Sequence, residues 1–251
     1  MPHPAECASL ERMARGGTRT ALRNDPQLYE TCADQWWQPR GAFAMLHWLA
    51  AARAALVPAA PRPDAVLVDL GCGAGLLAPH VADKGYQHIG VDRSPSALRQ
   101  AAEHGVQPVA GDVQAVPLPA EFADCVVAGE IFEHVVDLRA AVAEACRILR
   151  PGGLLVLDTL AATALCRVVA IGLAERLPRI APRGVHDPAL LVDRGVLVAE
   201  AAQHGVDLAL RGLRPSLRDL VAWSAQRRSS VRMVPVRTTA VLFQAIGWKK
   251  G

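Results

Sequence analysis

The residues of this chain best suited to binding chemistry form a glycine-rich run at positions 68–75, VDLGCGAG. Glycines at alternate positions let the backbone turn sharply and let a ligand approach the main chain where no β-carbon intervenes. Asp92 lies 23 residues after Asp69, at the end of a second apolar run. A carboxylate at that place can accept hydrogen bonds from both hydroxyls of a ribose. The spacing therefore predicts a loop that binds a nucleoside.

The spacing of the glycines also indicates which kind of nucleoside to expect. The run reads G-x-G-x-G, whereas dehydrogenases that bind a dinucleotide pyrophosphate carry G-x-G-x-x-G. Asp69 would also place a negative charge where a pyrophosphate has to lie. Both features disfavour a dehydrogenase and favour a nucleoside that carries positive charge, a description that S-adenosylmethionine fits. A glycine-rich turn without any ligand is the alternative.

A second group of reactive side chains, Glu130, Glu133 and His134, belongs to the end of a predicted strand at 123–131. Open α/β sheets bind ligands at the carboxyl ends of their strands, and Glu130 and Glu133 are spaced to share one side of a turn. In one interpretation all three residues hold Mg²⁺ or another divalent cation, which lowers the pKa of a bound hydroxyl group. In a second, His134 is the general base and no metal takes part. In a third, the Glu–His pair only caps the following helix.

Four further side chains have two interpretations each. Trp36 and Trp37 either cover the active site or pack in the core, and His47 lies in an apolar helical pattern that favours a packing role over a catalytic one. His186 precedes Asp187 and either caps the next helix or lies beside the substrate.

These groups have to be positioned by regular elements, and strands alternate with helices between residues 65 and 160. Apolar runs predict strands at 65–71, 88–94, 108–113, 123–131 and 154–160. Helical patterns cover 76–85 and 138–149, and a third helix begins at Ser94–Pro95 and ends at His104–Gly105. The alternation predicts a parallel sheet with helices on both faces. With 206–213 and 236–246 as a terminal pair, we expect a seven-stranded, doubly wound, mostly parallel α/β sheet that includes one antiparallel strand.

The remaining segments suggest how a single domain is organised. With 251 residues and 51% hydrophobic residues the chain can bury one large core. We expect a flexible tail at 1–23, because it is polar and aperiodic, and one domain at 24–251. Within that domain we expect an N-terminal helical lid at 24–60 and a helical insertion at 161–187.

Composition excludes several classes of protein. The net charge of +3 comes from dispersed basic residues, which argues against nucleic acid as a partner. The six cysteines form no C-x-x-C pair, and no run is long enough to span a membrane. We therefore expect a cytoplasmic protein. Residues 161–177 are apolar with interspersed basic side chains, so that segment either lies at a membrane surface or packs as a lid or homodimer helix.

Several motifs resemble known enzymes. The run DLGCGAG at 69–75 resembles the first motif of the class I S-adenosylmethionine-dependent methyltransferases, whose fold is Rossmann-like, and GDV at 111–113 resembles their adenine site. Residues 36–43 (WWQPRGAF), 129–135 (GEIFEHV) and 182–187 (PRGVHD) are similar to segments of the ubiquinone-biosynthesis O-methyltransferases. Those enzymes methylate phenolic hydroxyls of polyprenylated catechols and hydroquinones, and E-x-x-E-H is their proposed metal pattern.

The resemblance implies a set of site residues. Arg53 would contact the carboxylate end of the cofactor, and Gly129 stands where the family carries a methionine that contacts the cofactor. The family's Asn-Arg after the fifth strand is missing from 159–162 (TLAA). His134 and Glu130 would be catalytic, and Glu130, Glu133 and His134 would hold the metal. The implied cofactor-binding residues are Arg53, Asp69, Gly71, Gly73, Gly75, Asp92, Arg93, Asp112, Val113 and Gly129.

The expected activity is transfer of a methyl group from S-adenosylmethionine to a hydroxyl of a phenolic or quinol-type small molecule. One alternative is C- or N-methylation of another natural-product scaffold with the same cofactor site. Another is an inactive cofactor-binding partner in a biosynthetic complex. A nucleic-acid methyltransferase is disfavoured, because no N/D-P-P-Y/F motif follows the fourth strand.

Overall fold

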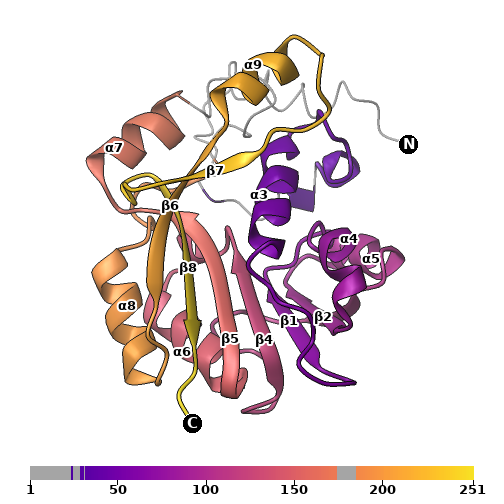
Figure 1. Ribbon diagram of the computed structural model, residues 1–251, viewed down its shortest axis with the longest axis vertical. Coiled ribbons are helices and arrows are strands. Elements are labelled where there is room, and N and C mark those ends of the chain that lie inside the picture. Colours follow the sequence, from indigo (N-terminus) through magenta and orange to yellow (C-terminus); the bar gives the residue numbers. More distant parts are fainter. Residues whose placement is uncertain (1–23, 25–28, 31, 174–184) are drawn as a thin grey trace, which may run out of the picture.

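The computed structural model describes residues 24, 29–30, 32–173 and 185–251, so the predicted tail at 1–23 lies outside the described part of the chain. The described residues form a mostly parallel sheet in the order β3-β2-β1-β4-β5-β8-β6-β7 (Figure 1). The strands are β1 (Val66–Leu70), β2 (Gln87–Asp92), β3 (Gln107–Ala110), β4 (Ala123–Gly129), β5 (Leu149–Leu160), β6 (Ala209–Pro215), β7 (Met233–Val236) and β8 (Leu242–Trp248).

The predicted doubly wound α/β sheet is confirmed, with one more strand than the seven expected. Strands β1 to β5 are parallel, and β8 lies antiparallel between β5 and β6. The additional strand is β7, a short edge strand that pairs antiparallel with β6. It precedes β8, so the predicted strand at 236–246 begins too early.

Helices cover both faces of the sheet. The α-helices are α3 (Ala44–Ala54), α4 (Ala78–Val81), α5 (Pro95–Glu103), α6 (Leu138–Ile148), α7 (Ala164–Cys166), α8 (Arg194–Gln203) and α9 (Leu217–Ser224). Short 3₁₀ turns are η1 (Ala33–Gln35), η2 (Ala82–Lys84) and η3 (Phe132–His134), and η4 (Arg167–Leu173) is a π-helix.

The two faces of β1 show why its residues other than Asp69 are apolar. Val68 packs in the large core that also contains residues of α6 and α8, such as Val142 and Leu197. Leu67 points to the other face, where it packs in a cluster with Val81 of α4. Because successive side chains of a strand alternate between faces, both sets must be apolar when both faces are covered.

Local signals set the ends of several helices. The side chain of Ser94 accepts a hydrogen bond from the backbone N–H of Ala97, and Pro95 occupies the first turn of α5, as predicted. Gly85 ends η2 in the left-handed conformation, with φ of 83°. The helix predicted at 76–85 is therefore α4 followed by η2.

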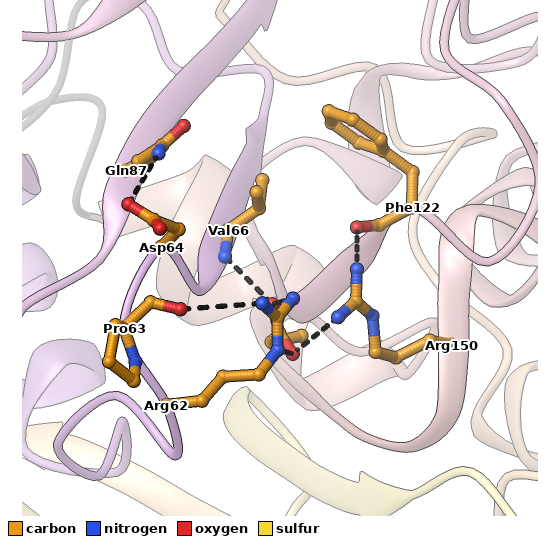
Figure 2. Close-up of polar contacts among 8 residues, drawn as sticks. Arg62, Pro63, Asp64, Val66, Gln87, Phe122 and Arg150 are labelled. Atoms are coloured by element: carbon orange, nitrogen blue, oxygen red, sulfur yellow. Dashed lines mark hydrogen bonds and ion pairs between the residues drawn. The ribbon is translucent and has the colours of Figure 1, made fainter.

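The buried carboxylate of Asp124 holds together the amino ends of β1 and β4. Figure 2 shows Arg62, Val66 and Arg150 around this carboxylate. Asp124 accepts hydrogen bonds from both guanidinium groups, at 2.9 to 3.1 Å, and from the backbone N–H of Val66 at 2.8 Å. These contacts stabilise the amino ends of the strands. The carboxyl ends, on the opposite side of the sheet, take no part in them and can form a site.

The described part of the predicted insertion is α7 followed by η4. Cys166 and Ala170 are buried against β6 and β8, whereas Leu165 and Val168 are 50% and 66% exposed. Within the described residues, no helix has the length and apolar character needed to cross a bilayer. Contact of 161–177 with a membrane surface or with a second copy of the chain stays a prediction.

Candidate active site

A cavity of about 830 Å³ opens at the carboxyl ends of β1, β2 and β4, and residues that precede α3 form part of its lining. It is the place at which open α/β sheets bind ligands. The predicted site residues that line it are Arg53, Asp69, Gly71, Gly73, Asp92, Arg93, Asp112, Val113, Gly129, Glu130 and His134. Gly75 and Glu133 are not part of the lining.

The glycine loop turns as its sequence predicts. Gly71 and Gly73 have φ of 68° and 51°, in the left-handed region that favours glycine. A β-carbon on Gly73 would lie 2.8 Å from the ring of Trp36, so this tryptophan packs directly over the loop. Gly75 is also in the left-handed region, with φ of 81°, and has a second reason to be glycine. Its β-carbon would meet the backbone of Ala101 in α5, which is a packing contact and not a ligand contact.

Asp92 ties the glycine loop to the end of β2. One carboxylate oxygen accepts a hydrogen bond from the backbone N–H of Gly73 and the other from that of Ser94, both at 2.8 Å. Burial raises the pKa of this carboxyl, and the backbone N–H groups act in the opposite direction. A carboxylate has about four acceptor positions, so Asp92 can still accept from a ligand in the cavity.

The other acidic residues of the predicted nucleoside site are Asp69 and Asp112, and each has one basic side chain nearby. Asp69 is buried, with His88 Nε2 3.7 Å from its Oδ2. Asp112 is half-buried beside Arg93, whose Nη1 lies 3.8 Å from Asp112 Oδ2. Both carboxylates line the cavity at its β1 and β3 sides.

Arg53 reaches the cavity from α3. Its Nε and Nη2 donate to the two carboxylate oxygens of Asp158 at 2.9 and 2.7 Å. Both side chains are buried, and Asp158 pairs with Gly129 across β5 and β4. Bidentate pairing of this kind fixes the plane of a guanidinium.

Glu130 and Glu133 form a buried acidic pair. Glu133 Oε2 accepts a hydrogen bond from Thr159 Oγ1 at 2.7 Å, while Glu133 Oε1 and Glu130 Oε1 have no partner among the described residues. Burial raises the pKa of both carboxyls, and for Glu130 the charges of Glu133 and Asp158 raise it further. Two adjacent buried carboxyl groups bind a proton or a cation more readily than isolated ones.

His134 is held in one tautomer. Its Nδ1 lies 2.6 Å from Asn24 Oδ1, while Asn24 Nδ2 donates to the carbonyl oxygen of His134 at 3.0 Å. Because the amide oxygen can only accept, Nδ1 carries the proton and Nε2 is the free base. Tyr29 Oη lies 3.5 Å from that Nε2. Burial, and secondarily the charge of His186, lower the pKa of His134 to about 3.

The cluster with metal-ligand geometry differs from the predicted one. One ligand atom each from Glu133, His134 and His186 lie within 4.8 Å of one another. The rings of His134 and His186 stack with centroids 5.5 Å apart. Glu130 is not part of this cluster, which therefore differs from the predicted set of Glu130, Glu133 and His134; that set stays a prediction. The reason is that η3 directs Glu133 and His134 towards His186, a residue from the far side of the insertion.

Aromatic side chains close the cavity. Trp36 stacks on Phe43 with centroids 4.3 Å apart, and Tyr29 stacks on both at 5.9 Å. Of the two interpretations for the tryptophans, Trp36 therefore covers the site, whereas Trp37 stacks on the ring of His104.

The side chain of His47 also contacts the backbone of Trp36. His47 Nε2 lies 2.8 Å from the carbonyl oxygen of Trp36, which supports the packing role. Sequence reasoning did not identify Asn24, Tyr29, Asp158 or Thr159 as site residues.

Comparison with known proteins agrees with this geometry. Residues 68–157 match the family model described as a methyltransferase domain. The chain is 32% identical to the ubiquinone biosynthesis O-methyltransferase of Thiobacillus denitrificans, over 71% of this chain and 81% of that protein. It is 33% identical to the protein of the same name from Methylococcus capsulatus, over 70% and 78%. Among solved structures, an S-adenosylmethionine-dependent methyltransferase of Mesorhizobium loti has a TM-score of 0.53 at 17% identity, covering 79% and 96%.

Proposed function

Because this chain belongs to the class I S-adenosylmethionine-dependent methyltransferases, in the family of the ubiquinone biosynthesis O-methyltransferases, we propose that it methylates a hydroxyl of a phenolic or quinol-type small molecule. One observation carries the proposal. One cavity is lined both by the glycine loop with Asp92 and by the imidazoles of His134 and His186. A nucleoside donor and a hydroxyl acceptor can therefore meet in it.

The residues of the cavity fit the cofactor. Asp92 keeps acceptor positions for the ribose hydroxyls, and Asp112 with Val113 lines the side on which the adenine would lie. The glycines at 71 and 73 line the cavity and take the left-handed conformations that the turn of the loop requires. The carboxylates of Asp69 and Asp92 favour a ligand with positive charge. S-adenosylmethionine supplies an electrophilic methyl group on a sulfonium.

The acceptor hydroxyl has to approach that methyl group in line and lose its proton. In the reaction the S–CH₃ bond breaks as the O–CH₃ bond forms, and S-adenosylhomocysteine leaves. A phenol has a pKa of about 10, so its anion needs stabilisation. His134 Nε2 is a free base that can accept the proton, and Met45, Leu46 and Val135 provide apolar walls that limit solvation of the nucleophile.

The low pKa of His134 makes it a weak base, which favours a second arrangement in which Nε2 binds a cation instead of accepting the proton. Glu133, His134 and His186 would hold that cation, and it would lower the pKa of a bound phenol. The unpartnered Oε1 of Glu133 supports this assignment. One carboxylate and two imidazoles suit Mn²⁺, Co²⁺ or Zn²⁺ better than Mg²⁺, whose sites are rich in oxygen.

The test is calorimetric titration of the full chain with S-adenosylhomocysteine, followed by a panel of catechols and hydroquinones, with and without Mn²⁺ or Mg²⁺. We expect cofactor binding, and metal-dependent binding of one or more of the phenols. Cofactor binding with no response to any phenol would refute the acceptor class while leaving the family unaffected. Failure to bind S-adenosylhomocysteine would refute the proposed function itself.

A further inference from the structure

Arg53 occupies space that any side chain at position 129 would need. A β-carbon built on Gly129 would overlap Cζ, Nη1 and Nη2 of Arg53. The φ of Gly129 is not in the left-handed region, so backbone conformation does not require glycine here. The requirement is steric: glycine at 129 leaves room for the guanidinium over the end of β4.

Asp158 determines how the guanidinium lies in that space. It engages Nε and Nη2, and Nη1 makes no hydrogen bond to any residue that the structure describes. Arg53 nevertheless lines the cavity. The pair with Asp158 therefore uses the Nε and Nη2 edge of the guanidinium and leaves Nη1 able to donate to another acceptor.

Several acidic side chains already face Arg53, and its own positive charge is the feature that can bind a further anion. Asp158, Asp69 and Glu130 all interact electrostatically with Arg53. The other guanidinium of the lining, that of Arg93, belongs to a side chain that is 70% exposed. Arg53 is thus the buried, permanently charged cation among the described residues of the lining, next to the turn where the glycine loop leaves β1.

We propose that Gly129 and Asp158 are positioning residues that together hold Arg53 so that Nη1 binds the carboxylate of the cofactor's amino-acid portion. This inference rests on the proposed function and deepens it. Gly129 leaves space for the guanidinium of Arg53, and Asp158 fixes the plane of that guanidinium. The cofactor carboxylate would accept the remaining hydrogen bond from Nη1. In this arrangement a methionine at position 129 is incompatible with the position of Arg53.

The experiment compares two ligands on each variant by calorimetry. One is S-adenosylhomocysteine, and the other is its decarboxylated analogue, which keeps the adenosine and the amine. Gly129→Ala displaces Arg53, Asp158→Asn keeps the shape of the side chain but loses the charge, and Arg53→Lys keeps the charge but loses the fork. Gly172→Ala, where the nearest atom to an added β-carbon is 3.6 Å away, and Asp83→Asn at an exposed site are the matched controls.

We expect Gly129→Ala and Asp158→Asn to weaken S-adenosylhomocysteine about tenfold or more and to change binding of the decarboxylated analogue less than about twofold. Equal losses for both ligands would show a merely structural role, and tighter binding by Asp158→Asn would show that Asp158 competes with the cofactor. Either result overturns the inference. If Gly129→Ala does not fold, Asp158→Asn and Arg53→Lys still decide it. A wild-type chain that binds neither ligand would instead refute the proposed function.

Discussion

Two hydrogen bonds join Asn24 to His134, 110 residues further along the chain. The amide of Asn24 donates to the backbone carbonyl of His134 and accepts from its Nδ1–H. The pair therefore fixes both the position of the loop after β4 and the tautomer of the imidazole. It leaves Nε2 unprotonated at the cavity, with Tyr29 Oη 3.5 Å away, as a base or metal-binding histidine requires.

Replacing Asn24 by Ala should lower turnover about 10–100-fold, because the imidazole loses the partner that orients it. Asn24→Asp is the matched control, since its carboxylate still accepts from Nδ1–H and should recover much of the activity. Steady-state rates and the Kd for S-adenosylhomocysteine check this. A loss of cofactor affinity as large as the loss of turnover would contradict an orienting role.

His134→Ala should abolish turnover and leave cofactor affinity nearly intact. The side chain lines the cavity and is not among the predicted cofactor-binding residues, so its removal takes away no predicted cofactor contact. Single-turnover assays beside calorimetry with S-adenosylhomocysteine separate the two effects. Full activity of the variant would eliminate both the base and the metal interpretation.

Asp92→Ala should weaken S-adenosylhomocysteine by about 1.5–3 kcal/mol, because it removes charge-assisted hydrogen bonds to the ribose. The structure adds a second consequence. The backbone N–H groups of Gly73 and Ser94 lose their acceptor, so the melting temperature should also fall. Calorimetry and thermal unfolding measure the two effects. Unchanged affinity would refute the ribose assignment even if the melting temperature fell.

The sheet could be predicted because its central strands carry local signals. Residues of β1 are apolar on both faces because helices cover both, and this pattern is visible in the sequence. The edge strand β7 could not be found in the same way. It has four residues, it pairs on one side only, and Pro235 interrupts its donors, which an edge strand tolerates.

The nucleoside side of the site was also visible, because the glycines and Asp92 form a local motif. Asn24 was not, and for His186 the sequence left a role beside the substrate and a helix-capping role open, since tertiary packing alone brings both residues to His134. Arg53 and Asp158 form an intermediate case. Each is a charged residue inside an apolar segment, and a buried charge requires a partner. That rule predicts a partner for each but does not identify it, and Asp158 was not identified from the sequence.

Removal of divalent cations should stop turnover if Glu133, His134 and His186 hold a metal. Mn²⁺, Co²⁺ or Zn²⁺ should restore activity at lower concentration than Mg²⁺, because two of the three donors are imidazoles. His186→Ala should raise the Kd for Mn²⁺, measured by calorimetry on the chelated protein without acceptor. Activity that is indifferent to chelators, with no Mn²⁺ binding, would leave His134 acting as the base alone.

Glu130→Gln should stabilise the protein at neutral pH but not at pH 4. Burial and the neighbouring charges raise the pKa of Glu130 well above its usual value of 4.5, so the folded protein retains a proton that the unfolded chain releases. As the pH rises above about 4.5, the free energy of unfolding of the wild type therefore falls, by up to about 1.4 kcal/mol per pH unit, until the pKa of the folded state is reached. Glutamine has no proton to lose and removes this dependence. Urea unfolding at several pH values in the presence of a chelator measures it, with the exposed Glu103→Gln as control. Parallel stability curves for Glu130→Gln and the wild type would mean that Glu130 has an ordinary pKa.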